Sequence, residues 1–107
     1  EQKNYEKSKF LFQKDIVFNP KESSSYLYLA KIFKIEKNEE EEEKNLNTVL
    51  VLTPKNEDAI NMLIKLKISQ SDFTKAQELL ETFNLVCNNL CHKTKQFQKD
   101  LDNSLAQ

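Results

Sequence analysis

The stretch "LFQKDIVFNP" at residues 11–20 has a counterpart in "LNTVLVLTP" at residues 46–54. Both stretches end in proline, and the interval from Pro20 to Pro54 defines a 34-residue period. Shifting the chain by one period, and then by a second, superposes apolar positions on one another. The equivalent positions are Phe12, Leu46 and Leu80, then Ile16 and Leu50, then Phe18, Leu52 and Val86. A fixed internal period of this length indicates a repeat architecture.

A second helical pattern lies between the copies. Its apolar residues are spaced i, i+3, i+4 and i+7, which places them on one helix face. They are Tyr26, Leu29, Ala30 and Phe33, and a shift by one period gives Ile60, Leu63, Ile64 and Lys67. The chain has no glycine, so it lacks the residue that tight β-hairpin turns need. Each repeat unit is therefore predicted to be a pair of helices, and the fold to be all-α.

Residues that end or cap helices give the expected helix bounds. Proline ends a helix, and Ser23, Asn56 and Ser71 are suitable residues for capping the helices that follow. A last apolar stripe formed by Leu90, Phe97, Leu101 and Leu105 predicts a terminal helix that covers the end of the array. The predicted helices are at about 3–18, 23–37, 40–52, 57–69, 72–87 and 89–105.

A 34-residue helix–turn–helix unit, with an aromatic and a small residue early in its second helix and a proline at its end, resembles the tetratricopeptide repeat. The segment "NYEKSKFLFQKDIVFNP" at 4–20 looks like the second helix of that repeat. In the third unit the matching residues are Leu63, Phe73, Ala76 and Leu80. The small residue is Ser8 in the first unit, but Glu42 takes its place in the second. The departure at Glu42 predicts weaker packing or a shifted register in the middle hairpin.

The resemblance implies one domain, residues 1–107, built as a short superhelix of stacked antiparallel hairpins. Its parts are the second helix of a partial repeat at 1–20, repeats at 23–54 and 57–88, and a capping helix at 89–107. It also implies a peptide-binding groove lined by the first helix of each unit. The lining residues are Leu27, Lys31, Lys34, Asn61, Lys65 and Ile68. The alternative is that these are ordinary solvated positions.

Charge and composition argue against several classes of partner. The 16 basic residues are all lysine and face 17 acidic ones, so no strong field or arginine fork is present to read nucleic acid. No run approaches the ~20 apolar residues that a membrane span needs. We therefore expect a soluble, cytoplasmic protein that binds neither nucleic acid nor membrane. Because the chain opens at Glu1 with what looks like half a repeat, we also expect a piece of a longer protein.

Three further features have a functional and a plain interpretation. The run Glu39–Glu43 either docks a basic partner or is a solvated helix start, which the acids favour through the helix dipole. Cys87, Cys91 and His92 suggest a metal site, but a structural zinc site has four ligands. We therefore prefer to interpret the two cysteines as thiols that are buried on a helix in a reducing compartment. No metal or cofactor is expected. The N-terminal helix lacks the first helix of its unit, so we expect that Phe10, Leu11, Phe12 and Phe18 cannot all be covered, and an exposed apolar end of this kind predicts association.

The sequence offers no catalytic constellation. A single His, no glycine-rich phosphate loop and no isolated carboxylate pair leave nothing to act as nucleophile, base and oxyanion donor together. We therefore expect no enzyme, and instead a scaffold that binds a peptide or helical segment of another protein. The alternative is an assembly element that joins subunits, including a homo-oligomer formed through the N-terminal helix.

Overall fold

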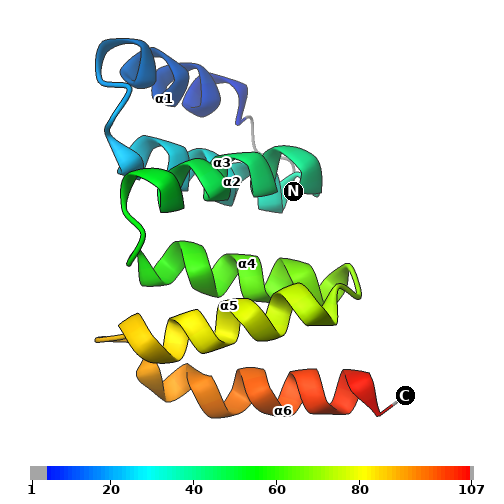
Figure 1. Cartoon of the computed structure of the whole chain (residues 1–107). Helices are drawn as coiled ribbons and strands as arrows, with labels where there is room; N and C mark the ends of the chain where they lie inside the picture. Colours follow the sequence, from blue (N-terminus) through cyan, green and yellow to red (C-terminus); the bar gives the residue numbers. More distant parts are fainter. Residues whose placement is uncertain (1–4, 107) are drawn as a thin grey trace. The chain divides into compact units, whose positions relative to one another are not determined.

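The computed structural model describes residues 5–106, and this part of the chain contains helices and no strand (Figure 1). The predicted all-α class is confirmed. The chain divides into two units, Glu1–Pro54 and Lys55–Gln107. The elements are α1 (Glu6–Phe18), α2 (Ser23–Ile35), α3 (Glu39–Leu52), α4 (Glu57–Ser69), α5 (Phe73–Val86), a 3-10 turn η1 (Cys91–Lys93) and α6 (Thr94–Leu105).

The 34-residue period of the sequence is also the period of the helices. The helices α2 and α4 both span 13 residues and begin at Ser23 and Glu57. The helices α3 and α5 both span 14 residues and begin at Glu39 and Phe73. The two hairpins therefore have a matching layout, as the repeat predicts.

The turn inside each hairpin is built in the same way without glycine. Lys37 and Ser71 adopt the left-handed conformation, with φ of 61° and 60°. The next residue then donates its backbone N–H to the carbonyl five residues back: Asn38 to Phe33 at 2.9 Å, and Asp72 to Lys67 at 2.9 Å. This arrangement satisfies carbonyls at the helix end. A non-glycine residue there costs about 1–2 kcal/mol, so tertiary packing must hold both turns.

Side chains cap the starts of α4 and α5. Asn56 accepts the backbone N–H of Ala59 at 3.0 Å, so the predicted cap of α4 is confirmed. The predicted caps at Ser23 and Ser71 are wrong. Ser23 is already the first residue of α2, and Ser71 has the left-handed backbone of the turn. Asp72 takes the role instead, and its carboxylate accepts the N–H of Lys75 at 3.2 Å.

In the first unit α2 pairs with α3, and α1 packs against α2. The rings of Phe12 and Tyr28 stack across the α1–α2 contact with centroids 5.3 Å apart. Fully burying a side chain of this size contributes about 1.5–3 kcal/mol, and this pair contributes less, because Phe12 is half-buried and Tyr28 is 49% exposed. The buried apolar residues of this unit are Leu27, Leu29, Ala30, Ile32, Phe33, Leu46 and Val49.

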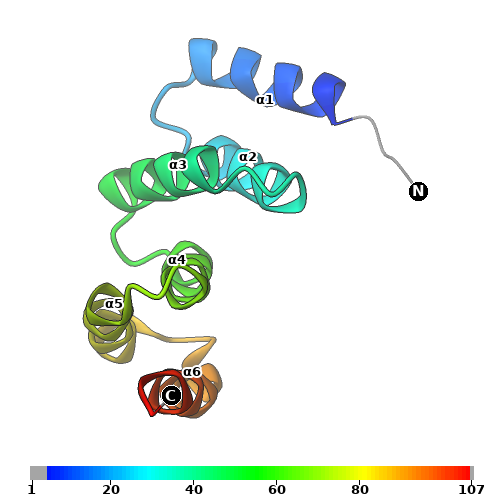
Figure 2. The same cartoon turned by 90° about the vertical axis from the view of Figure 1, so that its right-hand side faces the viewer.

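In the second unit α4 pairs with α5, and α6 packs against α5. Figure 2 looks nearly along the axes of these three helices and shows them side by side. The rings of Phe83 and Phe97 meet edge to face, with centroids 6.1 Å apart, and join α5 to α6. The buried apolar residues are Ala59, Ile60, Leu63, Ile64, Leu66, Ala76, Leu79, Leu80, Phe83, Phe97 and Leu101.

Equivalent positions of the two hairpins have equivalent surroundings. Leu46 and Leu80 are exposed by only 0% and 1%. Glu42 is buried, as is its counterpart Ala76. The helix α3 nevertheless keeps the register of the repeat, so the shift that Glu42 led us to expect does not occur.

The last helix departs from its prediction. It begins at Thr94 and not at residue 89, because α5 ends at Val86 and the chain first makes the 3-10 turn η1. Leu90 precedes that turn, and only Phe97 and Leu101 of the predicted stripe are buried. None of the helices described here has the length and apolar character that crossing a membrane requires.

Candidate protein-interaction site

The residues predicted to line a groove lie on the first helix of each hairpin. Lys31, Lys34 and Lys65 are exposed, and Ile68 is partly so. Leu27 and Asn61 are exposed by only 8% and 7%, so their side chains are part of the interior. One trio belongs to α2 in the first unit and the other to α4 in the second, and each trio is brought together on its own helix. The groove itself stays a prediction.

The helix α1 offers a different surface. None of its 13 residues is buried. Its half-buried residues, Ser8, Lys9, Phe12 and Ile16, lie at helical spacing on one side. The opposite side, called here the outer face, consists of Lys7, Phe10, Leu11, Lys14, Val17 and Phe18, all of which are exposed.

The apolar members of the outer face are large and strongly exposed. Phe10 is 63% exposed, Leu11 48%, Val17 77% and Phe18 73%. Lys7 and Lys14 lie two turns apart among them and make no ion pair within residues 5–106. The outer face therefore combines large apolar side chains with two positively charged lysines. Sequence analysis found three of its apolar residues but placed Phe12 with them, whereas Phe12 stacks on Tyr28.

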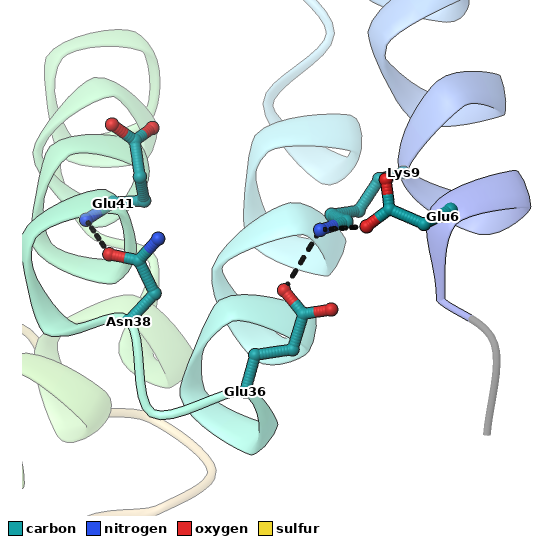
Figure 3. A network of polar contacts seen from close by, with 5 residues as sticks. All are labelled: Glu6, Lys9, Glu36, Asn38 and Glu41. Atoms are coloured by element: carbon teal, nitrogen blue, oxygen red, sulfur yellow. Dashed lines mark hydrogen bonds and ion pairs between the residues drawn. The ribbon is translucent and has the colours of Figure 1, made fainter. Parts of the chain in front are cut away.

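The other side of α1 is fixed to α2 by a lysine. Lys9 Nζ lies 2.7 Å from Glu6 and 2.9 Å from Glu36, and 5.3 Å from the centroid of the Phe33 ring. Figure 3 shows the Lys9 ammonium reaching from α1 to the end of α2. Hydrogen bonds from Lys9 to Glu6 and to Glu36 raise the pKa of Lys9 above 10.5. A lysine buried along its stem and paired at its tip thus orients α1, and leaves the outer face free.

The acidic run Glu39–Glu43 begins α3. Asn38 caps it by accepting the N–H of Glu41 at 3.3 Å, as Figure 3 shows. Glu42 stands at the small-residue position of the second unit, where the sequence predicted weaker packing, but its burial, at 3% exposure, was not predicted. Burial raises the pKa of the Glu42 carboxyl; the charge of Lys34 opposes this, while Glu39 and Glu43 add to it. The signal was available, because a shift by one period superposes Glu42 on Ala76.

The two cysteines form a disulfide, Cys87–Cys91, so the prediction of two buried thiols on a helix face is wrong. The helix ends at Val86, Cys87 is its extended C-terminal cap, and Cys91 opens the 3-10 turn. Within the described residues no group of three His, Cys, Asp or Glu side chains is placed to hold a metal ion. Disulfides persist mainly in oxidising compartments, which is at odds with the reducing location expected from the sequence.

A carboxylate holds the turn that the disulfide closes. Glu57, at the start of α4, accepts backbone N–H groups from Asn89 at 3.1 Å and from Leu90 at 2.8 Å. The backbone groups of Asn88, Leu90 and Asn89 lower the pKa of Glu57. The turn between α5 and α6 is thereby tied to the beginning of the hairpin.

One groove lies wholly within the second unit. It is open, has a volume of about 340 Å³, and lies beside α5 and the end of α6. Two apolar and four polar side chains line it: Phe73, Thr74, Gln77, Glu78, Glu81 and Leu105. Sequence analysis did not find this groove, because it depends on where α6 lies against α5.

Comparison with known proteins assigns no relative: neither a protein-family model nor a curated protein matches the chain.

Proposed function

We propose that this protein is a non-catalytic scaffold that binds a helical segment of a partner protein on the outer face of α1. The observation that carries the proposal is the exposure of Phe10, Leu11, Val17 and Phe18, which runs from 48% to 77% on one helix. A helix of 13 residues is marginal in water by itself, and contiguous exposed apolar surface marks an interaction site.

The outer face also indicates which features the partner should have. An amphipathic helix recognises such a surface through apolar residues at helical spacing. Lys7 and Lys14 are separated by two turns, ~10 Å along the helix axis. The partner helix is therefore one that presents an apolar stripe with acidic residues beside it, because opposite charges favour that register over others.

The periodic layout of the helices supports the resemblance to tetratricopeptide repeats, whose members bind peptides. The resemblance keeps two further candidate surfaces, one on each hairpin: Lys31 and Lys34 are exposed on α2, and Lys65 is exposed on α4. A cytoplasmic location stays a prediction from the sequence.

Site-specific photo-crosslinking separates the outer face of α1 from the other two surfaces. A photoreactive phenylalanine analogue replaces Phe10 in one version of the protein and the exposed Lys44 on α3 in a control. We expect a crosslinked partner from position 10 alone, and expect Val17→Ser with Phe18→Ser to abolish it. The double reversal Lys31→Glu with Lys65→Glu should leave the crosslink intact. Equal crosslinking at both positions, or loss only in the lysine reversals, would contradict the assignment to α1.

A further inference from the structure

The side chains that line the open groove of the second unit indicate what kind of group fits it. Phe73 and Leu105 supply its apolar surface, and Leu105 is 60% exposed. A hydrogen bond from Gln98 to Gln77 at 3.4 Å holds α6 against α5 beside the groove. The volume, about 340 Å³, is near the lower end of the range found for binding pockets. It suits a large side chain supplied by another helix.

The rim of the groove is acidic. Glu78 and Glu81 both line it and lie one turn apart on α5. Glu78 pairs with Lys75 at 3.9 Å, and both side chains are more than half exposed. An ion pair this exposed contributes little to stability. Glu81 accepts a hydrogen bond at 3.5 Å from the uncharged amide of Gln77. Both carboxylates therefore remain able to bind a cation that arrives with the occupant.

The outer face of α1 has the complementary pattern. Phe10 lies between Lys7 and Lys14, at spacings of three and four residues, so one helix face presents an aromatic ring flanked by two ammonium groups. We propose that the outer face of α1 in one copy of the chain docks into the acid-rimmed groove of a second copy. Phe10 enters between Phe73 and Leu105, and the two lysines meet Glu78 and Glu81. The inference rests on the proposed function, since it names the partner of the same face.

This contact joins two different surfaces of the molecule. Such a heterologous interface repeats head to tail, and it builds either an open chain of copies or a closed ring. Because four charges take part at a solvated rim, the association should weaken as salt is added.

Sedimentation of the 107-residue chain over a concentration series provides the test. We expect reversible association, and expect Lys7→Glu with Lys14→Glu to weaken it by roughly tenfold or more, since two exposed pairs become repulsive. Glu78→Lys with Glu81→Lys should do the same. A mixture of the two variants should associate again, because each supplies the surface that the other needs. The control, Lys44→Glu with Lys55→Glu, makes the same change in net charge as the first variant and should leave association unchanged.

Circular dichroism establishes that each variant is folded before it is compared. A monomeric wild type at every concentration overturns the inference, as does association that survives either reversal or a mixture that stays monomeric. These results are distinguishable from failure of the proposed function. A monomeric protein that still crosslinks from position 10 to another protein keeps the proposed function, whereas absence of any crosslink from position 10 removes both.

Discussion

The Oε1 atom of Glu57 lies 2.8 Å from the backbone nitrogen of Leu90, although the two residues are separated by an entire hairpin. The same carboxylate accepts the N–H of Asn89. The backbone groups of three successive residues thus interact with the Glu57 carboxylate at the point where the chain passes from α5 to α6. This contact fixes the path of the turn, and with it the position of the helix that covers the second hairpin.

Glu57→Gln should lower the melting temperature at pH 7 and make unfolding less dependent on pH. The pKa of Glu57 is lowered in the folded protein, so the stabilisation is present above its ordinary value of 4.5 and is lost as the pH falls below it. The gap between wild type and variant should therefore narrow as the pH falls from 7 to 3. Thermal unfolding at both pH values measures it. Asp58→Asn, in the same first turn, is the control, and a gap as wide at pH 3 as at pH 7 would be the contrary result.

Glu42→Ala should stabilise the protein at pH 7. The carboxylate is 3% exposed, and its Oε2 has no hydrogen-bond partner within the described residues. An unsatisfied buried group of this kind costs about 1–3 kcal/mol, and Ala76 shows that alanine suits the equivalent place. The variant should unfold at higher denaturant concentration.

The destabilisation caused by the Glu42 carboxylate should increase as the pH rises. Its pKa is raised in the folded state, so its contribution is favourable below the ordinary value of 4.5 and is lost as the pH rises through the folded value. Denaturant titrations at pH 4 and pH 7 test the sign. Glu40→Ala removes an exposed acid from the same turn and should stabilise at neither pH. A Glu42→Ala protein less stable than wild type at pH 7 would show that the carboxylate has a partner after all.

Reduction of the Cys87–Cys91 disulfide should destabilise the second unit. The cysteines are four residues apart, and the loop-entropy model gives about 2 kcal/mol for so small a ring. Hydrogen exchange should speed up in α6 and leave α2 and α3 unchanged. A Cys87→Ser, Cys91→Ser protein should match reduced wild type and ignore added reductant. Identical exchange in α6 with and without reductant would be the contrary result.

Lys9→Met should loosen α1 from α2. The substitution keeps the apolar stem but removes the ammonium that binds Glu6 and Glu36 and lies over the Phe33 ring. Amide exchange in α1 should accelerate, and exchange in α4 and α5 should not. Lys14→Met, on the outer face of α1, is the matched control. Equal exchange in the two variants would mean that Lys9 does not hold the helix.

The sequence predicted most of the fold because its signals were local and repeated. The two prolines, one period apart, and the recurring apolar positions located five of the helices to within a few residues, and Asn56 was recognised as a cap. The start of the last helix could not be found in this way. Its turn depends on a disulfide and on the distant Glu57, and neither leaves a periodic trace in the chain.

The candidate sites were less predictable for a related reason. The resemblance to tetratricopeptide repeats implied that Leu27 and Asn61 line a groove, but their exposure depends on which neighbouring helix covers them. In the same way, Phe10, Phe12 and Phe18 were predicted together as an exposed apolar group, whereas Phe12 belongs to the opposite side of α1 and packs on Tyr28. The groove beside Leu105 needs two helices to exist, so it has no signature in either one.

Nuclear Overhauser effects between aromatic rings show whether α1 packs by one side and presents the other for binding. We expect contacts between the rings of Phe12 and Tyr28 and between those of Phe83 and Phe97, with none from Phe10 or Phe18 to another helix of a monomer at low concentration. Strong contacts from Phe10 and Phe18 to methyl groups of another helix in that monomer would contradict this expectation.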